Sequence, residues 1–351
     1  MANANLTQRV ESELSALTRA ERMAAVDALH SMIERERFAL AVEGAGKVAC
    51  RECGSVTVVK RGKTAAGTQR YLCRDCGKTF TLNAGSVFAR SKLPAEAWMR
   101  FAECFVDGLP LRECADKCDV GLKTAFFMRH RVLESLFENL PAFQVKARCA
   151  SQLDETFFRE SFKGNHSKGS FAMPRPSRKR GSSLRMRGIS KEQICVLTGV
   201  NGSGDMFYDV ACRGRLDAGT ATDLLSGRIE SGALVATDKL NAYPAAMREL
   251  GVAAHEAFDA KTGKAHLNHV NNLHSRIDHF MKPFKGVATK HLAAYMAWFK
   301  WMACYHAGFD ETASLAVNQL AQGSYKTPWR DYKLKESPFM EYWEAKAASA
   351  A

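Results

Sequence analysis

The chain has 351 residues, enough for two or three domains, and its 50 Lys and Arg exceed its 37 Asp and Glu to give a formal net charge of +13. No apolar run approaches the ~20 residues of a membrane span, and the N-terminus lacks the basic and apolar blocks of a secretory signal. We therefore expect a cytoplasmic, nucleoid-associated protein with a polyanionic partner and no membrane contact. The 11 cysteines, an odd number, argue against a disulfide framework.

Residues 1–44 have the pattern of an N-terminal helical segment. TRAE at 18–21 is a capping box, with Thr18 at the N-cap and Glu21 three residues later. Val26, Leu29 and Ile33 then share one apolar face, and VEGAG at 42–46 ends the helix. The pattern predicts a small helical hairpin that serves packing or self-association.

A zinc ribbon is predicted over residues 45–82. Two C-x2-C pairs, separated by nineteen residues that contain two strand-like runs and a turn, supply four thiolates: Cys50, Cys53, Cys73 and Cys76. Two residues between thiolates let each pair hold one side of a tetrahedral ion, and a two-stranded hairpin would bring the pairs together. Four thiolates leave no open position, so the zinc should be structural. Lys60 and Arg61 on the hairpin are candidate phosphate contacts.

Residues 92–140 are typical of a helix-turn-helix DNA-binding domain. LRECADKC and LKTAFFMRHRVLESL are separated only by the short turn DVG. The second helix would face a DNA groove with Lys123, Thr124 and Arg129. An ordinary helical linker is the alternative interpretation.

From residue 148 to 306 strands and helices alternate after three initial strands. The order β-β-β-α-β-α-β-α predicts an α/β fold with a mixed sheet, which by analogy is a ribonuclease-H-like catalytic domain. A basic insert at 159–192 separates the first two strands, with ten Lys and Arg against one acid over 159–191. We expect this insert to bind phosphate through Arg175, Arg178, Lys179, Arg180, Arg185 and Arg187, the alternative being a solvated loop. Residues 307–351 form a C-terminal extension without a functional signature.

Two aspartates follow apolar runs in this domain. Asp154 lies within the strand-like CASQLDETFF, and Asp238 ends ALVATD. If the strands are neighbours, the two carboxylates face one pocket and, with a third oxygen ligand, suit Mg²⁺ or Mn²⁺. Two such ions support phosphoryl transfer. Each aspartate alone is equally well explained as a strand-end cap or turn former.

The chain resembles transposases of bacterial insertion sequences, in the ISXO-two-like (IS fifteen-ninety-five) group. The shared features span roughly residues 45–305 and include the ribbon, LDETFF, the basic insert, VATD and HLNHVNNLHSRIDHFMKPFKGVATKHL. The family pattern of His, any residue, Asn and two residues before the third catalytic position is met by His266, Asn268 and Asn271. The resemblance implies metal-dependent DNA strand cleavage and joining by a homo-oligomer on DNA.

The resemblance assigns Asp154, Asp238 and Asn271 as the catalytic metal ligands. Asn271 stands where most of this superfamily has Glu, and it offers a carbonyl oxygen without charge. His274 or water would supplement it. Asp278 stands where the family tends to place a basic residue, and Arg276 or Lys282 is expected to replace that contact.

Three functions remain open at this point. The first is an active transposase that binds the terminal inverted repeats of an element and joins them to target DNA. The alternative is a catalytically inactive, transposase-derived zinc-ribbon regulator, which the uncharged Asn271 and the acidic Asp278 favour. A third is a structural nuclease that cleaves without joining.

Overall fold

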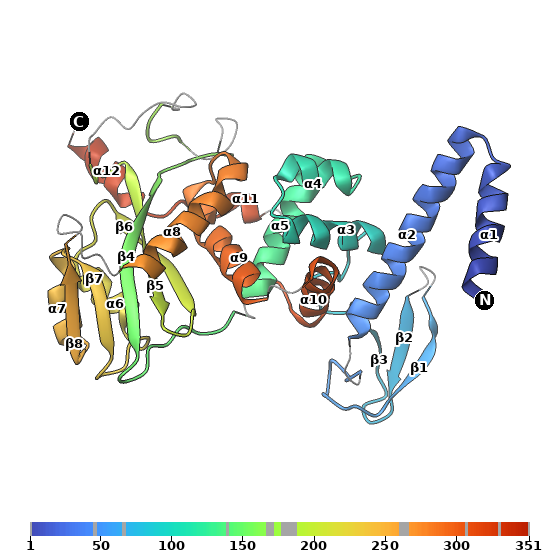
Figure 1. Cartoon of the computed structure of the whole chain (residues 1–351), viewed down its shortest axis with the longest axis horizontal. Helices are drawn as coiled ribbons and strands as arrows, with labels where there is room; N and C mark the ends of the chain where they lie inside the picture. The colour runs from blue at the N-terminus through green and yellow to red at the C-terminus, as the bar shows by residue number, and fades with distance from the viewer. Residues whose placement is uncertain are drawn as a thin grey trace. The chain divides into compact units, whose positions relative to one another are not determined.

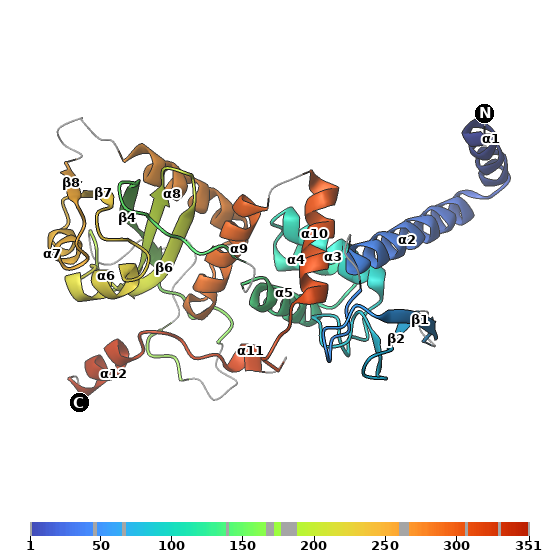
Figure 2. The same ribbon diagram turned by 90° about the horizontal axis from the view of Figure 1, so that it is seen from below.

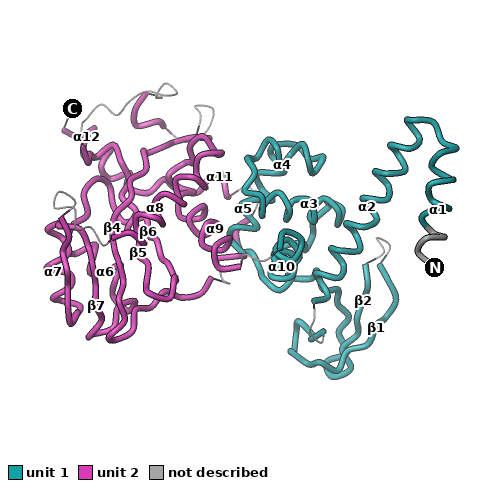
Figure 3. Tube along the Cα trace, viewed as in Figure 1, with its two compact units in different colours: residues 1–135, 306–326 teal, residues 136–305, 327–351 magenta. Residues whose placement is uncertain are grey.

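The computed structural model describes residues 2–44, 48–64, 68–137, 140–165, 172–176, 188–259, 267–305, 308–328 and 331–349. It contains two compact units, one formed by residues 1–135 and 306–326 and the other by 136–305 and 327–351 (Figure 3). The C-terminal extension is therefore divided between the units. Among the described helices, none has the length and apolar character needed to cross a membrane.

The first unit begins with two helices, α1 (Ala2–Ser15) and α2 (Arg19–Glu43). The capping box is confirmed, because the Thr18 hydroxyl accepts from the Glu21 amide and the Glu21 carboxylate accepts from the Thr18 amide. Near its C-terminal end, α2 buries Phe38 and Ala41 and packs against α3 (Ala95–Val106) and α10 (Phe309–Gln322). Residues 308–326, expected in a separate extension, thus complete the helical core of this unit.

The ribbon is a three-stranded antiparallel sheet in the order β1 (Val58–Lys63), β2 (Gln69–Cys73) and β3 (Thr79–Thr81). The first two strands form the expected hairpin, and β3 adds an edge that the sequence pattern had not indicated. Its small core contains Cys50, Tyr71, Cys73 and Phe80. Because this core is so small, the sheet depends on a further constraint to stay folded.

Helices α3, α4 (Leu111–Lys117) and α5 (Leu122–Phe137) follow the ribbon. A tight turn joins α4 to α5, with Asp119 in the left-handed region at a φ of 51°. The two helices and their short connection were expected, whereas their use in reading DNA stays a prediction.

The second unit contains a five-stranded mixed sheet in the order β6-β5-β4-β7-β8 (Figures 1 and 2). The strands are β4 (Ala150–Arg159), β5 (Gln193–Asn201), β6 (Met206–Arg213), β7 (Leu234–Asp238) and β8 (Ala254–Phe258). β4, β5 and β6 pair antiparallel, and β7 runs parallel to both β4 and β8. The expected strands and their alternation with helices are confirmed.

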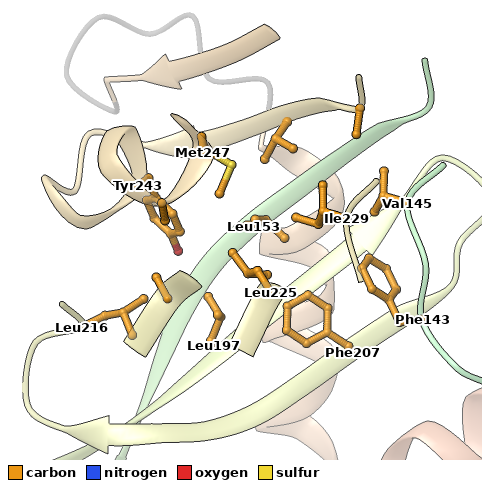
Figure 4. Close-up of a cluster of buried hydrophobic side chains, with 14 of the residues drawn as sticks. Phe143, Val145, Leu153, Leu197, Phe207, Leu216, Leu225, Ile229, Tyr243 and Met247 are labelled. Atoms are coloured by element: carbon orange, nitrogen blue, oxygen red, sulfur yellow. The ribbon is translucent and has the colours of Figure 1, made fainter. Parts of the chain in front are cut away.

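Helices cover both faces of this sheet. On one face, α6 (Ala218–Leu225) and α7 (Ala242–Glu249) share a core with Leu153 and Leu197 (Figure 4). On the other face, α8 (Asn268–Met281) and α9 (Leu292–Cys304) pack on Ile194 and Val196. The expected apolar stripe of α8 is confirmed by the burial of Val270, Leu273 and Ile277. His274 lies next to this stripe on α8 and reaches the middle of β5, where its Nε2 contacts the Thr198 hydroxyl.

Two short helices, α11 (Asp331–Leu334) and α12 (Glu341–Ala348), end the chain. The Trp343 indole donates to Glu160, which lies at the end of β4 and is 2% exposed. Glu160 also forms ion pairs with Arg213 and Arg175. A buried carboxylate is tolerated only with such compensation, so the cluster ties the C-terminal segment and the root of the basic insert to the sheet.

Candidate metal centres

The four ribbon cysteines lie together. All four Sγ atoms are within 4.8 Å of one another, with 3.7 Å between Cys50 and Cys76 and 3.6 Å between Cys53 and Cys73. Tetrahedral zinc with Zn–S bonds of about 2.3 Å places its sulfurs about 3.8 Å apart, so the donor set fits zinc. The predicted ligands are therefore brought together in the expected geometry.

Each cysteine pair is followed by a glycine that shapes the turn. Gly54 and Gly77 have φ values of 73° and 70°, and their amides donate to the carbonyls of Cys50 and Cys73. Only glycine adopts this backbone conformation without a steric cost. Amide hydrogen bonds, first that from Cys76, lower the pKa of Cys73 and favour its thiolate, whereas burial and hydrogen bonds among the thiols raise the pKa of Cys53 and Cys76.

Three carboxylates meet on the neighbouring parallel strands β4 and β7 of the second unit. Gln152 pairs with Ala236 in the parallel register, so continuing both strands by two residues places Asp154 beside Asp238. Oxygens of Asp154, Glu155 and Asp238 lie within 4.8 Å of one another. The expected proximity of Asp154 and Asp238 is thus present, and Glu155 joins them.

Glu155 was not anticipated because successive residues of a strand point to opposite faces. Its carboxylate accepts a hydrogen bond from the hydroxyl of Tyr243, a residue whose ring lies in the core under α7 (Figure 4). The adjacent acids of LDET indicated that a second carboxylate was near Asp154 in sequence. The hydrogen bond from Tyr243 of α7 to Glu155 could be recognised only from the fold.

The environment of these acids opposes their ionisation. Burial raises the pKa of Asp154 to about 6, and nearby Asp238 adds to the effect. Burial likewise raises the pKa of Glu155 to about 8, although the Tyr243 hydrogen bond works in the opposite direction. A divalent cation would offset the repulsion between these oxygens, and an all-oxygen donor set suits Mg²⁺ or Mn²⁺.

His274 of α8 is held against the same site. The Thr198 hydroxyl donates to the Asp154 carbonyl at 2.8 Å and lies 2.7 Å from His274 Nε2. Because that hydroxyl has one proton, it accepts from His274, which places the imidazole proton on Nε2. Burial lowers the pKa of His274, so the ring is neutral and its Nδ1 lone pair faces Asp154 Oδ2 at 3.8 Å. A cation between them would satisfy both groups.

Asn271 is exposed and lies one helical turn before His274 on α8. The amide donors at the start of this helix are held by Gln152 of β4, whose side-chain oxygen accepts from His269 and Val270. This contact fixes the helix start beside the acidic strand. The assignment of Asn271 as third ligand stays a prediction.

The residues expected to bind DNA have different environments. Lys60, Arg61 and Lys123 are exposed, and Thr124 is half-buried at the start of α5. The expectation for Arg129 is wrong: its side chain is buried, at 1% exposure, and its guanidinium donates to the Leu109 carbonyl and to Cys114 Sγ. Arg129 lies on the inward side of α5, where it joins α5 to the end of α3.

The structure describes three parts of the basic insert, residues 159–165, 172–176 and 188–192. The Arg175 guanidinium donates to the backbone carbonyl of Glu160 and pairs with its carboxylate, so it anchors the insert. The other expected phosphate ligands lie outside the described residues: Arg178, Lys179, Arg180, Arg185 and Arg187. His266 of the family pattern also lies outside them.

Residues 45–77 match a protein-family model described as the InsA N-terminal domain, a zinc ribbon. This match agrees with the four-cysteine geometry and supports a relation to insertion-sequence-associated proteins. A comparison with curated proteins found no match to the chain.

Removing one zinc ligand should release the metal from the ribbon. We expect the wild-type chain to bind one zinc and the Cys73→Ser variant to lose it, because three thiolates hold the ion less tightly and the small core cannot compensate. Metal analysis and the absorption of a Co²⁺-substituted sample measure this. Cys149→Ser, which changes an exposed cysteine outside the cluster, is the control. Full zinc occupancy in Cys73→Ser would contradict the assignment.

We expect the local stability of β4 and β7 to fall as pH rises, because of the acidic cluster. Folding raises the pKa of Asp154 and Glu155 from 3.8 and 4.5 to about 6 and about 8, so the folded state retains protons that the unfolded chain has lost. The stabilisation is complete below about pH 4 and is lost as pH rises through these folded-state values. Hydrogen exchange of β4 and β7 measures it in zinc-loaded protein without other metals.

Added Mn²⁺ should restore protection in β4 and β7, most strongly at the upper end of this range. Glu155→Gln keeps an acceptor for the Tyr243 hydroxyl and removes the titrating group, so it should flatten the pH dependence above about pH 6. An unchanged pH dependence in this variant would show that Glu155 does not govern local stability.

Proposed function

We propose that the chain is a DNA transposase of an insertion sequence, which binds the terminal inverted repeats of its element and catalyses metal-dependent strand cleavage and strand transfer. The observation that carries the proposal is the convergence of Asp154 and Asp238 from neighbouring parallel strands in a chain with an InsA-type ribbon. Paired carboxylates on neighbouring strands can hold the divalent ions that assist phosphoryl transfer.

The sheet supports a ribonuclease-H-like assignment for the second unit. Three antiparallel strands are followed by two parallel strands, the first strand is central, and helices cover both faces. Fold alone does not define function, and the carboxylates of β4 and β7 supply the chemical argument. The same sheet carries its two candidate metal ligands on its first and fourth strands.

In this proposal Asp154 and Asp238 hold the catalytic metal, with Asn271 or His274 completing the ligand set. Bound Mg²⁺ or Mn²⁺ supplies charge stabilisation at the reacting phosphate. Thr198 holds His274 in one tautomer, and Tyr243 orients Glu155 beside the two aspartates. Water first attacks the phosphorus at the element end, and the strand leaves with a 3′-hydroxyl. That hydroxyl then attacks a target phosphodiester, which joins the strands.

End recognition would belong to the first unit. Exposed Lys60 and Arg61 on β1 offer phosphate contacts, while Lys123 and Thr124 stand at the N-terminal end of α5. In a helix-turn-helix, the N-terminal residues of the second helix contact base edges in the major groove. We therefore assign α4 and α5 to DNA recognition and the ribbon to backbone contact.

A basic cavity in the second unit would hold the DNA strand next to the reacting phosphate. It has a volume of about 680 Å³, and five of the residues that line it are cations: Arg159, Lys163, Arg175, Lys282 and Lys285. Asp278, one turn after His274 on α8, also lines it, which places the cavity along the same helix as the candidate site. Its cationic lining suits a phosphate backbone.

The walls of this cavity are fixed by hydrogen bonds. The Lys163 ammonium donates to the carbonyls of Phe284 and Gly286, and Ser161 and Thr289 exchange two further hydrogen bonds. Lys282 and Lys285 are exposed and stand on the segment held in this way. Their backbone is therefore fixed before a phosphate binds, and binding would order only the two lysine side chains.

Replacing Asp238 should abolish strand cleavage. We expect Asp238→Asn to lower Mg²⁺-dependent nicking of a plasmid carrying the cognate ends by at least about a thousandfold, because it removes a charged metal ligand. Asp223→Asn, which changes an exposed acid on α6, is the matched control. Equal nicking by Asp238→Asn and the wild type would contradict the mechanism.

The same assay tests the third ligand and the alternative function. Asn271→Ala should abolish nicking, whereas Asn272→Ala should not. A DNA-binding regulator without catalysis is favoured by the uncharged Asn271 and by Asp278 in place of a basic residue. That function predicts end binding with no nicking by the wild type under any divalent cation, and a nuclease predicts nicking without strand-transfer products.

Removing Lys282 and Lys285, two of the exposed cations of the cavity, should weaken DNA binding without loss of the metal site. The logarithm of the binding constant for single-stranded DNA falls linearly with the logarithm of the salt concentration. We expect this slope to become shallower by about 1.5 when Lys282→Ala is combined with Lys285→Ala, because two phosphate contacts are lost. Fluorescence anisotropy over a salt series measures it. Lys146→Ala combined with Arg148→Ala, both exposed at the start of the second unit, is the control. Equal slopes for the two variants would remove the cavity from the DNA path.

A further inference from the structure

Helix α2 presents an apolar face to solvent. Met23, Val26, Leu29, Met32, Ile33 and Leu40 are each between 36% and 63% exposed. The side of α2 that packs on α3 and α10 is a different one, which carries Phe38 and Ala41. At about 3.6 residues per turn, Val26, Leu29, Ile33 and Leu40 fall on one stripe of the helix, and such a stripe of exposed apolar side chains marks an interaction surface.

Charges on this face are arranged symmetrically about Leu29. Arg22 lies seven residues before Leu29 and Glu36 seven residues after it, and both side chains are exposed. Seven residues make almost two helical turns, so the three side chains form one line along the helix. The cation at one end and the anion at the other make the face complementary to itself when it is reversed.

We propose that α2 pairs antiparallel with α2 of a second copy of this chain, about a two-fold axis at Leu29. The axis brings Leu29 against its own equivalent and sets Arg22 of each copy beside Glu36 of the other. It also sets Val26 of each copy beside Ile33 of the other, so apolar side chains fill the centre and ion pairs close both ends. A parallel pair would put like charges together at both positions, which opposes that orientation.

The helix is ready for this contact in a single copy. The capping box at Thr18 fixes its start, and two ion pairs, Arg100 with Glu34 and Arg37 with Glu103, hold its inner side on α3. The outer face is therefore rigid, and its pairing does not require refolding. This surface lies apart from the acidic cluster and does not rest on the proposed catalysis.

Charge reversal tests the pairing on the zinc-loaded full chain without DNA. In sedimentation equilibrium we expect a dimer whose dissociation constant rises about tenfold for Arg22→Glu and for Glu36→Arg, because each change turns two ion pairs into two repulsions. The double variant restores both pairs with exchanged partners and should return to the wild-type value. Asp27→Arg, an exposed charge reversal on the other side of α2, is the control.

Cross-linking gives a second readout. Leu29→Cys should form a disulfide between two copies under mild oxidation, and Asp27→Cys should not exceed the background of the native cysteines. A monomer at every concentration reached would overturn the proposal. So would a dimer that withstands both single reversals, or a double variant as weak as the single ones.

Discussion

The parallel pairing of β4 with β7 is the constraint on which the second unit depends. Its register, with Gln152 opposite Ala236, places two acids that are distant in the sequence side by side on neighbouring strands. A slip of one residue would turn one carboxylate to the other face of the sheet. Buried Leu153 and Val235, packed beneath α6 and α7, fix this register because a slip would expose them. The hydrophobic core therefore determines the geometry of the polar site.

Hydrogen bonds from residues of β5 and α7 fix the side chains around Asp154 and Asp238. Thr198 stands opposite Asp154 on β5 and orients His274, while Tyr243 reaches Glu155 from α7. The pKa values of Asp154 and Glu155 are raised because these carboxylates have lost water without gaining a cationic protein partner that would compensate them. Such an arrangement costs stability in the metal-free state and is typical of functional sites. The ribbon likewise combines a small core with four clustered cysteines, an arrangement expected to depend on a bound metal for its stability.

Much of this architecture could be predicted from local patterns. The capping box, the paired cysteines and the apolar stripe of α8 each depend on short-range spacing, and each is confirmed. Features set by tertiary contacts could not be predicted. The residue type and helix position of Arg129 suggest an exposed DNA contact. Its guanidinium instead donates to the Leu109 carbonyl and to Cys114 Sγ in the interior. The Glu155 carboxylate, next to Asp154 in sequence, is held by a hydrogen bond from Tyr243 of α7, and α10 returns to the first unit by packing that no local pattern specifies.

We propose that Asp154 and Asp238 together hold one divalent metal ion. Iron-directed cleavage tests it most directly: Fe²⁺ in place of Mg²⁺, with ascorbate and peroxide, cuts the backbone close to the bound ion. We expect the polypeptide to be cleaved near both residue 154 and residue 238. Excess Mg²⁺ should suppress this cleavage, and it should be absent in Asp154→Ala. Cuts at only one of these strands, or an unchanged pattern in Asp154→Ala, would contradict it.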